Sequence, residues 1–167
     1  MMSIRRDVLL LDTRTTALPR AMLDAYLCDL RSWITDLCRS ADRGAPLSLV
    51  DALYGPPSTP GAFARWDSIG PHAALRRQYG LSADALAILI IIAAPRLWGP
   101  LAHVYAAIAG RVGIDEHVVA KLLGDRSAVL RELAREAPLL AFGLVARRPT
   151  GELVASSEVV CRLVAGR

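Results

Sequence analysis

The chain has 167 residues, of which 53% are hydrophobic and only 5% aromatic, so Leu, Val, Ile and Ala must fill its core. The net charge is +4, and both halves share it equally, with ten basic and eight acidic residues in residues 1–81 and again in residues 82–167. This interspersed charge indicates a mixed solvated surface and disfavours the clustered basic footprint of a nucleic-acid-binding protein.

The N-terminal residues and the cysteines indicate a cytoplasmic protein. Residues 8–11 are apolar and form either a strand or the entry to the first helix, but four residues are too few for a signal-peptide core. Three cysteines at wide spacing argue against a disulfide framework. Cys28 and Cys38 are expected on one helix, about 15 Å apart, which is too far for a disulfide. The reducing cytoplasm is therefore the expected location.

The first predicted helix begins after Pro19 and ends before Gly44 and Pro46. One apolar stripe recurs along it at spacings of four and three residues: Leu23, Leu27, Leu30, Ile34 and Leu37. This stripe can pack against the rest of the chain, which we favour, or against another subunit. It is therefore also a candidate contact surface.

A loop-rich stretch follows this helix. Residues 47–54 are predicted to form a short helix, which the sequence GPPSTPG at residues 55–61 ends. Phe63, Trp66 and Ile69 then recur at a spacing of three, which predicts another short helix packed on the core. Residues 72–79 are predicted to be helical up to Gly80.

The stretch at residues 85–94 has no polar side chain, and it organises the prediction of the fold. A helix that is apolar on every side must be covered on every side. It is too short to cross a bilayer, which needs roughly 20 residues. We therefore expect a buried central helix, capped by Ser82 and bent or ended by Pro95.

The remaining chain predicts three amphipathic helices, a β-hairpin and a last helix. The helices are expected at residues 100–110, at residues 115–124 with Asp115 as cap, and from Asp125 or Ser127 up to Pro138. Two short apolar runs, 139–145 and 153–155, flank a Pro/Gly turn and read as a hairpin. Ser156 or Ser157 is expected to cap the last helix, residues 158–164.

This order of elements predicts a mainly α fold. A helical N-terminal segment, residues 1–74, is expected to pack on the core. A winged-helix-like domain with a small β-hairpin, residues 75–167, is expected to follow. Its helix-turn-helix would comprise residues 100–110 and 115–124, and its wing would comprise residues 139–155.

A series of short motifs runs through residues 75–167: GLS at 80–82, APRL at 94–97, VY at 104–105, LL at 122–123, APL at 137–139, GL at 143–144 and VVCRLVAG at 159–166. Together they resemble the N-terminal winged-helix region before the ATPase module in a bacterial group of AAA+ ATPases. That group is similar to the valosin-containing-protein type, and some members are associated with contractile injection systems. Arg96 departs from the resemblance, because the group usually has an acidic residue there.

The resemblance implies that the parent protein hydrolyses ATP, forms a ring, and remodels or helps assemble other proteins. The chain contains no G-x-x-x-x-G-K-[ST] motif. Either the chain is the N-terminal part of a longer protein, which we favour, or the ATPase module has been lost. ATP and magnesium are expected only in that module. The chain itself is expected to be non-catalytic. Its expected role is to bind a client or partner protein, or to dock on the ATPase ring.

No catalytic, cofactor-binding or metal-binding residue is predicted. The three histidines are 31 and 14 residues apart, and no Cys or His pair has zinc spacing. Asp115 and Glu116 open a predicted helix, where the helix dipole favours carboxylates. Cys161 is expected to be a small buried hydrophobe.

The alternative function is a winged-helix DNA-binding transcriptional regulator. Its recognition helix would begin with Asp115 and Glu116, which have the wrong sign to meet phosphates. Arg147 and Arg148 at the tip of the predicted wing are candidate contacts to a partner or to phosphate. Protein–protein interaction is therefore favoured over nucleic-acid binding, and no membrane contact is expected.

Overall fold

The computed structural model describes residues 18–41, 54 and 61–165. These residues form a mainly helical fold with a small two-stranded antiparallel sheet, as the sequence predicts. The elements in chain order are α1 (Arg20–Ala41), η1 (Ala62–Trp66), α3 (Pro71–Tyr79), α4 (Ala83–Leu97), α5 (Leu101–Ala109), α6 (Glu116–Leu123), α7 (Arg126–Glu132), α8 (Pro138–Ala141), β1 (Val145–Arg147), β2 (Leu153–Ala155) and α9 (Ser157–Ala165). The predictions for residues 8–11, 44–53 and 55–60 lie outside the described residues.

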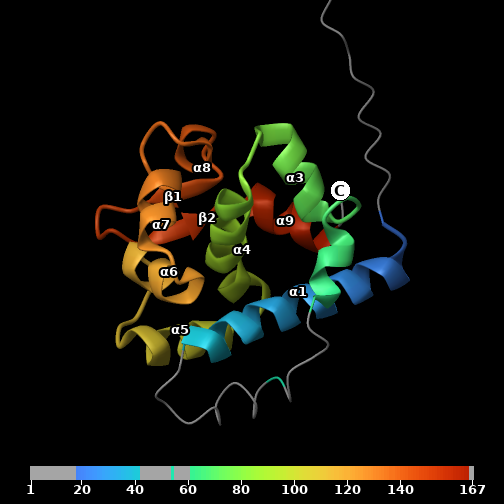
Figure 1. Cartoon of the computed structure of the whole chain (residues 1–167), viewed down its shortest axis with the longest axis horizontal. Helices are drawn as coiled ribbons and strands as arrows, with labels where there is room; N and C mark the ends of the chain where they lie inside the picture. The colour runs from blue at the N-terminus through green and yellow to red at the C-terminus, as the bar shows by residue number, and fades with distance from the viewer. Residues whose placement is uncertain (1–17, 42–53, 55–60, 166–167) are drawn as a thin grey trace, which may run out of the picture.

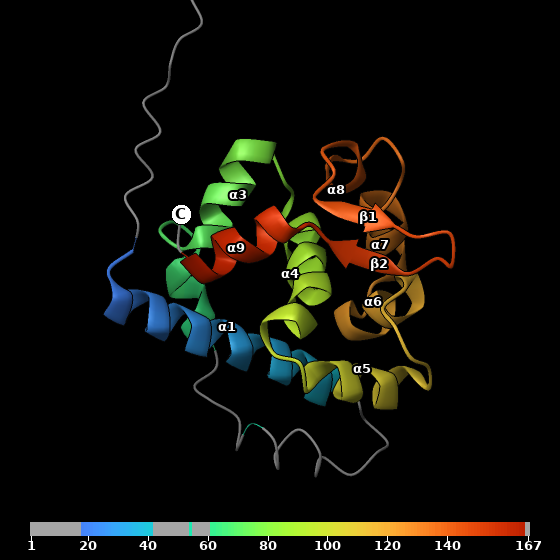
Figure 2. The same cartoon turned by 180° about the vertical axis from the view of Figure 1, so that it is seen from behind.

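Helix α4 stands at the centre of the molecule, with α1 and α5 across one end of it (Figure 1). Helices α6 and α7 and the hairpin lie on one side of α4, and α3 and α9 lie on the other (Figure 2). Every residue from 85 to 94 except the half-buried Ala87 is buried. The prediction of a covered central helix is therefore confirmed. Among the described residues, no helix combines the length and the apolarity that crossing a membrane requires.

The two ends of α4 differ in how well the sequence predicts them. Ser82 caps the first turn, because its Oγ accepts a hydrogen bond from the Ala85 N–H at 3.0 Å. Pro95 does not end the helix, which continues for two more residues to Leu97. Proline lacks the N–H that would bond to the carbonyl four residues earlier, that of Ile91. The buried Tyr105 hydroxyl donates to this Ile91 carbonyl at 3.0 Å, so α5 replaces the missing helix bond.

Helix α1 turns its apolar stripe towards the core. Leu30 and Ile34 are buried, and the other three members pack against the core while half-buried: Leu23, Leu27 and Leu37. The prediction of packing within the chain is confirmed. The alternative role of this stripe as a contact surface for another molecule stays a prediction.

Between α1 and α4, the predicted short helix is the 3-10 helix η1. Trp66 is buried and Phe63 packs against the core, but Ile69 is 54% exposed and lies beyond the helix. The expectation that Ile69 packs with the other two is therefore wrong. Three residues per turn aligns Phe63 with Trp66, but the helix ends before it can align Ile69.

Two predicted caps set the positions of α6 and α7. Asp115 accepts from the Val118 N–H at 2.9 Å, and Asp125 accepts from the Ala128 N–H at 3.0 Å. Gly124 ends α6 in the left-handed conformation, at φ 77°, which glycine adopts at little cost. Asp125 rather than Ser127 is therefore the cap of α7.

The predicted hairpin is shorter than expected at its N-terminal side. Pro138 opens the short helix α8 instead of closing α7, which ends at Glu132. Proline suits the first position of a helix because its missing N–H has no partner there in any case. Residues 139–141 are therefore helical, and only Val145–Arg147 forms strand β1, paired antiparallel with β2.

The hairpin is joined to the helices on both sides of β2. The Leu153 N–H donates to the Ile114 carbonyl at 2.7 Å, which attaches the segment before α6. Arg96 at the end of α4 donates to the Ala155 carbonyl at 2.7 Å and to Ser157 Oγ at 3.3 Å. Ser156, not Ser157, accepts from the Val159 N–H at 3.2 Å and caps α9. An arginine at position 96 thus has a structural role in this chain.

One hydrophobic core includes residues from both predicted parts of the chain. Tyr26 and Leu30 of α1 belong to the same buried cluster as α4, the hairpin and α9. The predicted boundary between residues 74 and 75 falls inside α3. The division at this boundary stays a prediction.

Candidate functional site

Arg147, one of the two predicted contact residues, is bound within the chain. Its Nη2 lies 2.6 Å from Glu116 Oε1 at the start of α6 and donates to the Leu133 carbonyl at 2.9 Å. One guanidinium therefore links the hairpin to the beginning of α6 and to the end of α7. A phosphate or a partner carboxylate would have to displace Glu116 to reach it.

Arg148, the second predicted contact residue, lies on the turn of the hairpin. Its Nη1 contacts Glu152 Oε2 at 2.8 Å, and 59% of its side chain is exposed. Exposed ion pairs of this kind contribute little to stability, so Arg148 is the more available of the two arginines. Although Arg147 and Arg148 are neighbours in the sequence, their side chains lie in different environments.

Asp115 holds a third arginine on the same face. The Arg111 Nη1 lies 2.6 Å from Asp115 Oδ2. Partial burial raises the pKa of Asp115, but the hydrogen bonds from the Val118 N–H and from Arg111 outweigh it, so this pKa lies below its usual range. Asp115 is therefore ionised at neutral pH and keeps a negative charge at the start of α6.

Two shallow grooves flank these ion pairs. One, of about 340 Å³, lies between α6, α7 and Arg147, with Val129 and Leu130 in its lining. The other, of about 730 Å³, lies between the hairpin, the end of α4 and the loop before α6, where Val112 is 94% exposed. Both linings mix apolar side chains with charges of both signs, which suits contact with a protein surface better than a small ligand.

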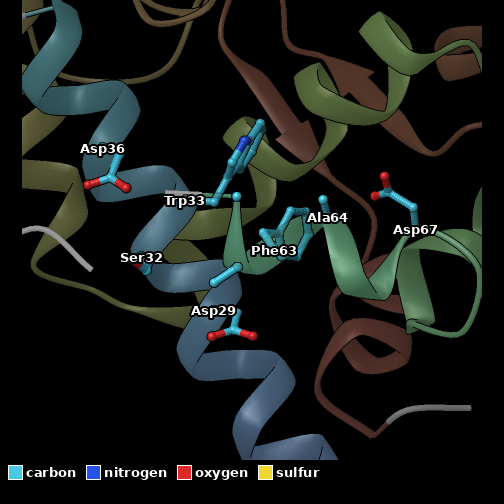
Figure 3. Close-up of a pocket in the computed structure, with 9 residues that line it drawn as sticks. Asp29, Ser32, Trp33, Asp36, Phe63, Ala64 and Asp67 are labelled. Atoms are coloured by element: carbon cyan, nitrogen blue, oxygen red, sulfur yellow. The ribbon is translucent and has the colours of Figure 1, made fainter. Parts of the chain in front are cut away.

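A third pocket, of about 380 Å³, lies between α1 and η1 (Figure 3). Trp33 and Phe63 stack in it with ring centroids 5.6 Å apart, and three carboxylates line it: Asp29, Asp36 and Asp67. Two of these carboxylates are already engaged. Asp29 Oδ2 accepts from Trp66 Nε1 at 2.7 Å and lies 2.6 Å from Arg65 Nη2, and Asp36 lies 2.6 Å from Arg39. The contacts of Asp29 with Arg65 and Trp66, and the stacking of Trp33 on Phe63, therefore hold η1 against α1.

His72 is the buried titratable group beside this pocket, with 1% of its surface exposed. Its Nδ1 lies 3.2 Å from the Tyr26 hydroxyl, and its ring stacks on Phe63 with centroids 4.7 Å apart. Its Nε2 lies 3.6 Å from Asp67 Oδ1 and has no hydrogen-bond partner among the described residues. Burial lowers the pKa of His72, Asp67 partly opposes this shift, and the charge of Arg76 adds to it.

We expect the protein to lose stability as the pH falls below about 6.5, the usual pKa of histidine. The folded-state pKa of His72 is lowered, so the unfolded chain binds the proton first, and the free energy of unfolding falls as the pH drops. The contribution of His72 is complete above that pH. Urea unfolding between about pH 7.5 and pH 5.5 measures the slope, and NMR titration of the imidazole assigns it.

The matched variants for this prediction are His72→Gln and His117→Gln, the second at an exposed position. The pH slope should shrink in His72→Gln and stay unchanged in His117→Gln. A slope of the opposite sign, or one that survives in His72→Gln, contradicts the assignment.

The cysteines of the described part of the chain, and its possible metal ligands, do not form a recognisable site. Cys161 is exposed, so the expectation that it is buried is wrong, because α9 turns Val159 and Leu163 inward instead. Cys28 is exposed and Cys38 buried on the same helix. No group of three or more His, Cys, Asp and Glu side chains within residues 18–41, 54 and 61–165 could hold a metal ion.

Sequence reasoning missed the pocket of Figure 3, since its lining residues on α1 and those in and beside η1 are about 30 positions apart in the chain. It also missed the ring contact between Tyr79 and Phe142, which joins α3 to α8. Comparison of the chain with protein-family models, with curated proteins and with solved structures gave no match in any of the three. The resemblance to AAA+ ATPases therefore stays a prediction.

Proposed function

We propose that this chain is the non-catalytic N-terminal region of a bacterial AAA+ ATPase of the cytoplasm, where it binds a protein partner or docks on the ATPase ring. The motifs in residues 75–167 support this proposal. ATP and magnesium belong to the ATPase module in cis, and the parent ring remodels or assembles other proteins, as in contractile injection systems.

A winged-helix arrangement of residues 75–167 is part of the proposal. The order of α4, α5, α6 and α7 before the hairpin supports it, with α8 as an added turn of helix. The bond from the Leu153 N–H to the Ile114 carbonyl also supports it, because it adds the segment before α6 to the open edge of the hairpin.

One observation carries the choice of protein partners over DNA. The arginines in the loop before α6 and on the hairpin are paired with carboxylates of the same chain at 2.6–2.8 Å: Arg111 with Asp115, Arg147 with Glu116 and Arg148 with Glu152. DNA binding depends on cations that are free to neutralise phosphates. Here each phosphate would have to compete with a carboxylate, and Asp115 and Glu116 would repel it.

Titration of a fluorescein-labelled duplex at about 50 mM and about 200 mM salt tests this choice. We expect no saturable binding at either concentration, and no difference between the wild type and the Arg147→Ala/Arg148→Ala double variant. Saturable binding that weakens steeply with salt and is lost in the double variant would establish the DNA-binding alternative. The coding sequence downstream of residue 167 tests the ATPase assignment, since the proposal requires a phosphate-loop motif there.

A further inference from the structure

Helices α3 and α8 lie at the same end of the molecule (Figure 1), and there the rings of Tyr79, at the end of α3, and Phe142, just after α8, contact each other as an aromatic pair. Phe142 is 60% exposed, and its ring centroid lies 5.4 Å from that of the half-buried Tyr79. The two rings come from residues 63 positions apart and link α3 to the end of α8. Large aromatic side chains at such positions are the usual anchors of protein–protein interfaces.

The backbone holds both rings in place. The Arg76 carbonyl accepts hydrogen bonds from the N–H groups of both Gly80 and Leu81, which fixes the turn that carries Tyr79. The Phe142 N–H donates to the Pro138 carbonyl at 3.0 Å, and the buried Leu139 and Leu144 anchor the chain on either side. The backbone that carries the rings is therefore preorganised, which lowers the entropy lost on binding.

The charge beside the aromatic pair is positive. Arg76 lies one helical turn before Tyr79, Arg77 is its neighbour, and both are exposed in the last turn of α3. Arg162 of α9 reaches the same turn through a hydrogen bond to Gln78 and pairs with Glu158 at 2.8 Å. Within the part of the chain that the structure describes, no carboxylate pairs with Arg76 or Arg77. Arg77 donates a hydrogen bond to the Ser68 carbonyl at 3.0 Å, so Arg76 supplies the free positive charge beside the aromatic pair.

This charge selects among possible occupants. A second copy bound through the same face of both molecules would bring two sets of arginines together, which is unfavourable. An anionic membrane surface is recognised by clusters of about four to eight basic residues, more than this surface offers. A polypeptide that carries acidic residues beside an apolar side chain complements both features at once.

We propose that Tyr79, Phe142 and Arg76 form a docking site for an acidic peptide segment of a partner protein, which places an apolar side chain against the Phe142 ring. This inference deepens the proposed function and rests on its choice of protein partners. The aromatic pair supplies the apolar contact, and Arg76 selects the acidic residues that flank it.

Selection from a phage-displayed library of random peptides tests the site with the full chain as bait. We expect the enriched peptides to be acidic and to contain an aromatic or large aliphatic residue. Fluorescence anisotropy of the enriched peptides should give dissociation constants that rise about tenfold or more in Phe142→Ser and in Arg76→Glu. Binding should also weaken with salt. Both positions are exposed, so circular dichroism should show that the variants fold.

The matched control is Met22→Ser/Arg20→Glu, which makes the same two kinds of change at exposed positions of α1. Peptide affinity in this variant should equal that of the wild type. The proposal is overturned if no peptide is enriched, if enriched peptides lack acidic residues, or if Phe142→Ser and Arg76→Glu bind them unchanged. Self-association that Phe142→Ser abolishes, or binding to phosphatidylserine vesicles that Arg76→Glu abolishes, would assign the patch to another occupant. These outcomes are independent of the duplex titration, so failure of the docking site can be told apart from failure of the proposed function.

Discussion

Replacing Tyr105 by Phe should lower the free energy of unfolding by about 1–3 kcal/mol, although it removes only one oxygen atom. Pro95 leaves the Ile91 carbonyl without its helix donor, and the Tyr105 hydroxyl supplies the hydrogen bond at 3.0 Å. Ile91 and Tyr105 are both buried, so no water reaches the Ile91 carbonyl in place of the Tyr105 hydroxyl. Urea unfolding followed by circular dichroism measures the loss.

A double-mutant cycle with Pro95→Ala identifies the cause of that loss. Alanine at position 95 restores an N–H that can bond to the Ile91 carbonyl, so the Tyr105→Phe change should cost less in this background. Tyr79→Phe is the matched control, because the Tyr79 hydroxyl forms no hydrogen bond among the described residues. An equal cost of Tyr105→Phe with and without Pro95 would refute the coupling.

The largest single loss is expected from Leu89→Ala, at about 2–5 kcal/mol. Leu89 is fully buried in the middle of α4, which is covered on every side. Alanine would leave a cavity that the surrounding helices cannot close without moving together. Because domains are stable by only about 5–15 kcal/mol, this variant should be largely destabilised in thermal and urea unfolding.

Leu130→Ala removes the same atoms at a position on α7 that is 51% exposed. We expect this control to change the free energy of unfolding by about 0.5 kcal/mol or less. Similar losses in the two variants would show that α4 is not the covered centre of the fold. A small loss in Leu89→Ala alone would lead to the same conclusion.

The core is the basis for both functional proposals. The apolar side chains of α4 are buried against the surrounding helices and the hairpin, so they cannot form a binding surface. The candidate contact surfaces among the described residues are instead the ion pairs on the α6 and hairpin face and the aromatic pair of Tyr79 and Phe142. Recognition by this chain therefore depends on residues that the core does not need.

Local signals in the sequence determined the position of most helices. Ser82, Asp115 and Asp125 cap their helices because a short side-chain oxygen can accept a hydrogen bond from an N–H three residues later, whatever surrounds it. The apolar run at residues 85–94 had to be covered, since water cannot solvate a helix that is apolar on every side. These properties depend on neighbours within one or two helical turns, so the sequence alone contains them.

Contacts between distant residues decided the rest. Pro95 is tolerated inside α4 because the Tyr105 hydroxyl happens to reach the carbonyl that proline leaves unpaired. Arg147 is a structural link rather than a free contact because folding brings Glu116 and the Leu133 carbonyl to it. The pairing of Tyr79 with Phe142 likewise exists only after α3 and α8 have packed on α4. Hydrogen bonds and ring contacts act over a few ångströms, so the tertiary structure alone determines which of these groups meet.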